Sequence, residues 1–232
     1  MRRLPAKTVY YGLEFTLSVP TWVVMAVYLV SDLELSPLQL VLMGTAMEAP
    51  VFLFEIPTGV VADIYSRRLS LIVGFIGTGV AWMLVGFVSA PWLIIALWAF
   101  WGLSYTFTSG AYEAWITDEV GAENIGSLFL RGSRISYAGA VVGLALQVAL
   151  GTFVSLQAGV VAGGAVTIAS GLACIFLMPE TGFRRRPREE RGSAVREFRT
   201  KAGRGARFAW AQRVVMLLIT VELFMGMSSE AF

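Results

Sequence analysis

Five glutamates of this 232-residue chain lie inside long apolar stretches, where a charged side chain is costly. They are Glu14, Glu48, Glu55, Glu222 and Glu230. No Lys or Arg lies deep in the same stretches to neutralise them. Each glutamate is therefore expected to be protonated, hydrogen bonded or open to a water-filled cavity. Carboxylates in this setting are candidates for handling protons or cations.

Helical spacing places polar residues of two stretches on common faces. One face carries Glu14, Ser18, Thr21, Met25 and Tyr28, and the other carries Thr45, Glu48, Phe52, Glu55 and Gly59. At about 1.5 Å per residue, Glu14 lies about 10 Å past Lys7 and Glu55 about 12 Å before Asp63, so the two should share a depth, with Glu48 deeper. The pattern favours a polar cavity. For Ser and Thr, hydrogen bonding between helices of a dry bundle is an equal alternative.

A further apolar stretch carries an aromatic series with polar groups at its end. Its members are Trp98, Trp101, Tyr105, Ser109 and Tyr112. Tyr105 and Ser109 are candidates for lining a substrate path. The aromatic side chains could equally face the lipid tails, and both interpretations stay open.

The composition excludes several kinds of chemistry. The chain has no His and a single Cys174, which removes His-based catalytic triads, Cys/His zinc sites and disulfides. Hydrophobic residues make up 56% and charged residues 15%, against about 25% charged in soluble domains. The net charge of +2 gives no argument for nucleic acid. We expect a membrane protein that is not an enzyme and needs no metal or cofactor.

Uncharged runs over residues 69–112 and 135–179 are each about twice the length that one helix needs to cross a bilayer. Each run predicts a helical hairpin, with breaks at Ser89-Ala90-Pro91 and around 151–157. The expected spans are 8–30, 38–62, 69–88, 92–115, 132–150 and 158–178. The chain thus divides into a six-helix bundle (1–179), a basic linker (180–212) and an incomplete seventh helix (213–232).

All 18 Lys and Arg residues fall in alternate gaps between these spans. They occupy the N-terminus, the 2–3 loop, the 4–5 segment and the 6–7 segment. The positive-inside rule then places the N-terminus and the long 6–7 segment in the cytoplasm of a multi-pass protein of the cell membrane. The arginines of the 6–7 segment either form a solvated linker or dock on anionic lipid headgroups.

Charges of the 2–3 loop have signs that the neighbouring helix dipoles do not favour. Asp63 ends one span and Arg67 and Arg68 begin the next. The arrangement makes sense if Asp63 pairs with Arg67 or Arg68, or faces the N-terminus of another helix. A second set of partners is available after the fourth span, in Glu113, Asp118 and Glu119.

This loop resembles a signature of the major facilitator superfamily. The matching residues are Gly59-x-x-x-Asp63-x-x-Ser66-Arg67-Arg68, preceded by Glu55-x-Pro57-Thr58-Gly59, which is common in drug-efflux-like members, and followed after the fourth span by residues 112–119. The resemblance implies an all-α polytopic fold, of which this chain supplies the N-terminal six-helix bundle as a 3+3 inverted repeat. It also implies a second six-helix half, which we expect outside this sequence.

The resemblance further implies a charge latch that holds the outward-facing state. It maps onto Gly59, Asp63, Arg67 and Arg68, with Asp118 or Glu113 as the partner from the fourth span. Two positions depart from the signature, since Ile64 stands where a basic residue is usual and Ser66 where Gly is frequent. The antiporter pattern of the fifth span is half present, in Gly139 and Gly143, with Leu144 in place of Pro.

These features together predict a secondary transporter that exports small lipophilic or cationic molecules in exchange for protons. Its partners would be the lipid bilayer, the small-molecule substrate and protons. The pathway residues would be Glu14, Ser18, Thr21, Glu48, Glu55, Tyr105 and Ser109. The alternatives are an uptake symporter of the same fold and a non-transporting membrane sensor or interaction protein.

Overall fold

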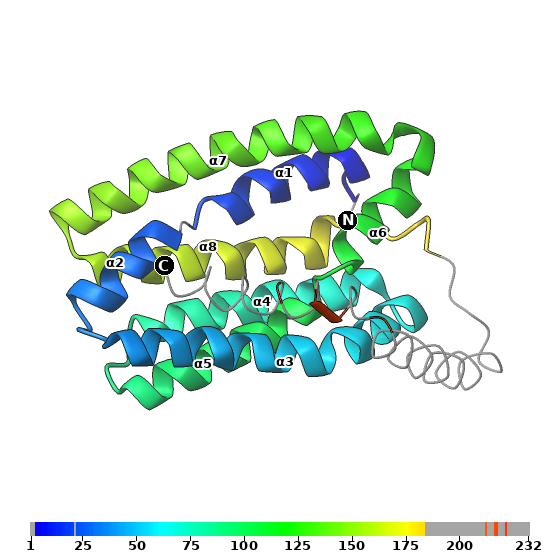
Figure 1. Ribbon diagram of the computed structural model, residues 1–232. Coiled ribbons are helices and arrows are strands. Elements are labelled where there is room, and N and C mark those ends of the chain that lie inside the picture. The colour runs from blue at the N-terminus through cyan, green and yellow to red at the C-terminus, as the bar shows by residue number, and fades with distance from the viewer. Residues whose placement is uncertain (1–2, 21, 184–211, 213–215, 218–220, 222–232) are drawn as a thin grey trace.

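The computed structural model describes residues 3–20, 22–183, 212, 216–217 and 221 (Figure 1). Thr21, Glu222 and Glu230 therefore lie outside the described residues, as do most of the segment 180–212 and most of the expected seventh span.

The described elements are helices. In chain order they are α1 (Ala6–Ser18), α2 (Trp22–Ser31), α3 (Pro37–Ile64), α4 (Arg67–Val85), α5 (Pro91–Thr106), α6 (Ala111–Val120), the 3-10 turn η1 (Ala122–Asn124), α7 (Ile125–Phe153) and α8 (Leu156–Leu177). They form six runs that are long and apolar enough to cross a membrane: Ala6–Ser31, Pro37–Ile64, Arg67–Val85, Pro91–Val120, Ile125–Phe153 and Leu156–Leu177. The predicted all-helical fold with six spans is confirmed.

Two of the six runs are broken, where the sequence predicted continuous helices. The first run is interrupted near Pro20, which lacks the amide hydrogen that a helix interior needs. The fourth run is interrupted before α6 by Gly110, whose φ of +67° is a left-handed conformation that glycine adopts readily. Helix then continues to Val120, so the predicted end of this span at residue 115 is too early, and Asp118 lies within α6 and not after the span.

The helices lie roughly along one direction and pack in pairs (Figure 1). The main pairings are α4 with α8, α3 with α5, α1 with α7 and α4 with α5. In the first pair glycines allow close approach, since a Cβ on Gly164 would lie 2.5 Å from the Met83 nitrogen. Small residues at such crossings are typical of helix contacts in membranes, where packing replaces the hydrophobic effect as the driving force.

Two apolar clusters fill the interior, one toward each end of the bundle. The first joins α1, α4, α6 and α8 around residues such as Tyr10, Leu71 and Trp115. The second joins α2, α3 and α5 around Met25, Leu29 and Trp98. Met25 and Tyr28 belong to this second core, so the polar face predicted from Glu14 onward does not continue into α2 as a cavity lining. The break at Pro20 changes the helical register that the prediction assumed.

One end of the bundle, which we name the basic end, carries the N-terminal segment, the α3–α4 loop, the α6–α7 connection and the end of α8 (Figure 1). The described basic residues lie in its segments and in the helical turns next to them: Arg3, Lys7, Arg67, Arg68, Arg131 and Arg134. Arg131 and Arg134 lie inside α7, which begins earlier than predicted, and not in a loop before it. The charge partition seen in the sequence therefore coincides with one end of the fold.

Candidate functional site

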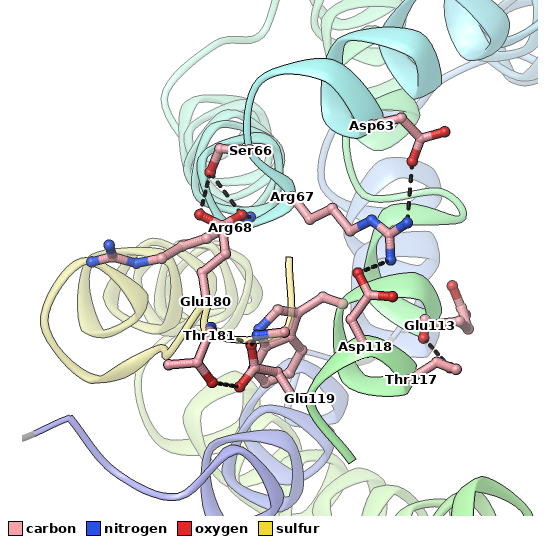
Figure 2. Close-up of polar contacts among 12 residues, drawn as sticks. Asp63, Ser66, Arg67, Arg68, Glu113, Thr117, Asp118, Glu119, Glu180 and Thr181 are labelled. Atoms are coloured by element: carbon pink, nitrogen blue, oxygen red, sulfur yellow. Dashed lines mark hydrogen bonds and ion pairs between the residues drawn. The ribbon is translucent and has the colours of Figure 1, made fainter. Parts of the chain in front are cut away.

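Arg67 lies at the centre of an ion-pair cluster at the basic end, where α3, α4 and α6 meet (Figure 2). Its Nη1 lies 2.6 Å from the Asp118 carboxylate, and its Nη2 lies 3.4 Å from Asp63. The ring of Phe183 stands 5.8 Å from the guanidinium carbon. Arg67 and Asp118 are 17% and 31% exposed and Asp63 is 60% exposed, so the Arg67–Asp118 pair is the better shielded of the two.

Arg68 takes a different role from its neighbour. Its side chain donates to the carbonyl oxygens of Cys174, at 3.3 Å, and of Ile175, both in the last turn of α8. A cation is favourable at a helix C-terminus, where the carbonyl groups make the dipole negative. The positive charge that is misplaced at the start of α4 is therefore well placed for α8, a relation that the sequence does not display.

Glu180, which follows α8, in turn caps the start of α4. The Ser66 hydroxyl and the Arg68 backbone amide donate to its carboxylate at 2.9 and 3.0 Å (Figure 2). Ser66 also caps α4, because its side chain accepts a hydrogen bond from the Leu69 amide at 3.0 Å. A carboxylate at this helix start is stabilised by the dipole. The start of α4 and the end of α8 are thus each capped by a charge from the other helix or its extension.

Residues 179–183, which we name the exit segment, are held against α6. Trp115 donates its indole N–H to the Pro179 carbonyl at 2.7 Å. The Glu119 carboxylate accepts hydrogen bonds from the Thr181 amide and hydroxyl and from the Gly182 amide (Figure 2). Gly182 has to be small, since a Cβ there would lie 2.1 Å from the Asp118 carbonyl oxygen.

The sequence alone does not single out Glu180 or the exit segment, although it offers Glu119 as a partner candidate. The local signal is a carboxylate directly after an apolar run, which by itself only marks the end of a span. Its partners, Ser66 and Arg68, lie more than a hundred positions earlier, so no local pattern connects them.

A second polar group surrounds Glu14, away from the ion-pair cluster. A pocket of about 200 Å³ between α1, α6 and α7 is lined by Tyr10, Glu14, Tyr112, Glu113, Phe129 and Ser133. The Tyr10 and Tyr112 side chains lie beside Glu14 in this pocket, and the Tyr112 hydroxyl donates to the Tyr10 carbonyl oxygen at 3.4 Å. The two tyrosine rings stack with centroids 5.5 Å apart. Glu113, one of the expected latch partners, therefore belongs to this pocket, and the Arg67 pair uses Asp118.

Other predicted pathway residues form separate contacts. Ser18 and Ser136 share a hydrogen bond of 2.6 Å between α1 and α7. Ser109, in the break between α5 and α6, donates to Glu55 of α3 at 2.8 Å. Glu48 is half-buried in α3, and Tyr105 is exposed on α5. Glu55 does not line the Glu14 pocket, so the two predicted carboxylates occupy different contacts.

Gly59 has open space around it, since a Cβ placed there meets no atom within 4 Å. The structure thus gives no steric reason for glycine at this position of the motif. Among the described residues, no group of three or more His, Cys, Asp or Glu side chains is arranged to hold a metal ion.

Six membrane-length helices with a charged 2–3 loop define a membrane transporter fold. Residues 9–232 match the Major Facilitator Superfamily, so the chain belongs to this family of transporters, which are not enzymes. It is similar to an uncharacterised MFS-type transporter, YxaM, of Bacillus subtilis (strain 168), with 28% identity over 132 residues. That alignment covers 57% of this chain and 32% of the relative, so the chain spans about a third of the relative's length.

Proposed function

We propose that this protein is part of a secondary transporter that exports small lipophilic or cationic molecules in exchange for protons by alternating access. The observation that carries the proposal is the Glu14 pocket, in which a carboxylate inside a membrane-length run lies beside two tyrosine side chains and a second carboxylate. No Lys or Arg is among the residues that line it. Such a pocket suits protons and cations better than anions.

The surroundings of Glu14 suggest how it would alternate between two states. When charged, its carboxylate attracts a cation into the pocket that it shares with Tyr10, Tyr112 and Glu113. When protonated, it no longer attracts a cation, so proton binding and cation binding at the pocket exclude each other. This competition is what exchange of a proton for a cationic substrate requires.

Glu55 supplies a second carboxylate for the same function. It accepts from Ser109 and lies on an exposed face of α3, beside Phe52, which is 72% exposed. An acidic residue among exposed aromatic and aliphatic side chains suits a lipophilic cation. The motif Glu55-x-Pro57-Thr58-Gly59, common in drug-efflux-like members, supports export as the direction.

The decisive experiment measures proton-coupled flux by the full-length protein in proteoliposomes. Candidate cationic compounds are added under an imposed pH gradient, and proton movement is followed with an enclosed pH-sensitive dye. We expect Glu14→Gln and Glu55→Gln each to lower coupled flux at least about tenfold, because the neutral amide carries no exchangeable proton. Glu123→Gln, at an exposed position of η1, is the matched control.

Unchanged flux in both Gln variants would overturn the assignment of these carboxylates. Accumulation of substrate inside vesicles in symport with protons would instead favour uptake. Absence of any solute or proton movement would favour a non-transporting sensor.

We further propose that the Arg67 cluster is the conformational latch of this transporter, lying in the cytoplasm and holding the outward-facing state. Its support is that one guanidinium ties three helices together through Asp63 and Asp118. Gly59 and Arg68 belong to the same motif, and Arg68 acts by fastening α4 to α8. Residues 1–179 would then move as one half, with 180–212 as the linker and 213–232 as the first helix of the other half.

Accessibility labelling tests the latch in the full-length protein. In a Cys174→Ala background, a cysteine introduced at the exposed position Thr45, in the half of α3 away from the basic end, reports whether that half is open to water. We expect Asp63→Asn to lower the labelling rate of this cysteine by roughly twofold to fivefold, because the outward-facing population falls when the latch weakens. An unchanged rate would remove the role from Asp63.

A further inference from the structure

A second cavity, unrelated to the polar pocket, runs between α1 and α8. It has a volume of about 440 Å³ and an almost wholly apolar lining, which includes Thr8, Gly12, Thr16, Ala169, Ala173 and Leu177. The Ser170 and Thr16 hydroxyls, which are polar groups of this lining, are hydrogen bonded to each other at 2.9 Å. The cavity is therefore a groove for an apolar guest.

The groove lies on the side of α1 that faces away from the proposed transport site. Gly12 lines the groove and Glu14 lines the polar pocket. Residues two positions apart on a helix are rotated by about 200° from each other, so positions 12 and 14 point in nearly opposite directions. Gly12 and Ala169 are both exposed, so the groove opens outward from the bundle. In a bilayer, lipid tails surround this outward side.

The size of the groove limits what can occupy it. An α-helix with its side chains is about 10–12 Å across, too wide for this volume. The space is about three times that of a 150 Å³ cavity, which takes up a benzene ring. A single alkyl chain fits, whereas a further helix of this chain or of a second copy would rest only on the rim.

One end of the groove carries positive charge. The Leu4 amide donates to the Leu177 carbonyl at 3.3 Å, which fastens the N-terminal segment to the end of α8. Leu4 and Thr8 line the groove there, and their sequence neighbours Arg3 and Lys7 are both exposed. Neither Arg3 nor Lys7 forms an ion pair within the described part of the chain, where the ion pairs are those of Arg67.

We propose that this groove binds one acyl chain of an anionic phospholipid, whose phosphate headgroup is held by Arg3 and Lys7. Burial of the tail alone gives little gain, because the surrounding lipid is equally apolar. Selectivity therefore comes from the shape of the groove together with attraction between the two basic residues and an anionic headgroup. The site is independent of the transported substrate.

Native mass spectrometry of the full-length protein tests the proposal, with phosphatidylglycerol and phosphatidylcholine of the same acyl chains as probes. We expect retention of one phosphatidylglycerol and about tenfold weaker retention of phosphatidylcholine. Gly12→Phe fills the groove with a ring, since a Cβ at Gly12 meets nothing within 4 Å. It should lower phosphatidylglycerol retention about tenfold. Gly126→Phe in α7 is the matched control, because Gly126 is equally open, and it should retain the lipid.

The headgroup contact is tested separately with Arg3→Gln and Lys7→Gln. Each should lower the preference for phosphatidylglycerol over phosphatidylcholine several-fold, without abolishing retention of the tail. Equal retention of the two lipids by the unaltered protein, or retention by Gly12→Phe equal to that of Gly126→Phe, would overturn the proposal. A loss of dimer mass in Gly12→Phe with unchanged lipid would also overturn it, in favour of a second copy in the groove.

Discussion

Arg67 has two carboxylate partners at unequal distances, and the difference decides what each contributes to stability. The contact with Asp118 is short and half shielded, whereas the contact with Asp63 is longer and faces solvent. The Nε of Arg67 is buried without a partner among the described residues, so water can do little to replace a lost ion pair. Loss of the Asp118 charge therefore leaves a poorly compensated cation.

We expect Asp118→Asn to lower the free energy of unfolding by about 1–2 kcal/mol, because a charge-assisted hydrogen bond is lost. Asp63→Asn should cost less than about 0.5 kcal/mol, since exposed ion pairs contribute little. Unfolding by denaturant in detergent micelles, followed by tryptophan fluorescence, measures both. Equal losses would show that the two pairs are equivalent in solution.

Glu180 shows the other use of charge at the residue scale. Its carboxylate has no basic partner in the described ion pairs, yet it accepts from the Ser66 hydroxyl and the Arg68 amide at the start of α4. The helix terminus itself supplies the positive potential. Glu180 thus contacts the backbone of Arg68 and not its charged side chain.

At the scale of elements, the spans were predictable because the bilayer imposes one requirement on each. A spanning helix needs about 20 apolar residues, and this constraint is visible without any tertiary contact. The break before Pro91 was also predictable, because proline restricts the residue before it. The interruption at Gly110 was not, since glycine is common inside these helices and only the tertiary structure shows which one takes a positive φ.

The candidate site was predictable only in its local part. The loop motif places Asp63 at the end of α3 and Arg67 at the start of α4, and their pairing follows from the short loop between the two helices. The caps formed by Arg68 and Glu180 depend on how α4 meets α8. The grouping of Glu14 with Tyr112 and Glu113 depends on how α1 meets α6. Such contacts join distant segments, so spacing along one helix gives no signal for them.

The α4–α8 contact is the element-scale feature that we expect to be least tolerant of larger side chains. We predict that Gly164→Val lowers the free energy of unfolding by about 1–3 kcal/mol, because its Cβ would lie 2.5 Å from the Met83 nitrogen and 2.7 Å from the Gly79 carbonyl oxygen. Ala165→Val, the exposed neighbour on α8, is the control and should change stability little. Thermal unfolding in detergent measures both variants, and an equal effect would show that the crossing can relax.

At the scale of the whole molecule, the two ends of the bundle differ in charge and in construction. The basic end is tied by ion pairs, helix caps and the exit segment, all contributed by polar groups. The opposite end is joined by short turns and packed by aromatic rings, including Trp22, Trp98 and Trp101. Positive charge gathered at one end is the pattern that orients membrane proteins during insertion.

We therefore predict that the basic end of the protein faces the cytoplasm, a topology that labelling of intact cells can test. In a Cys174→Ala background, Ser89→Cys places a thiol at the opposite end and Glu123→Cys places one at the basic end, both at exposed positions. A membrane-impermeant maleimide should label Ser89→Cys on intact cells and Glu123→Cys only after lysis. Labelling of Glu123→Cys on intact cells, with Ser89→Cys protected, would mean that the basic residues do not set the orientation and that the latch lies outside.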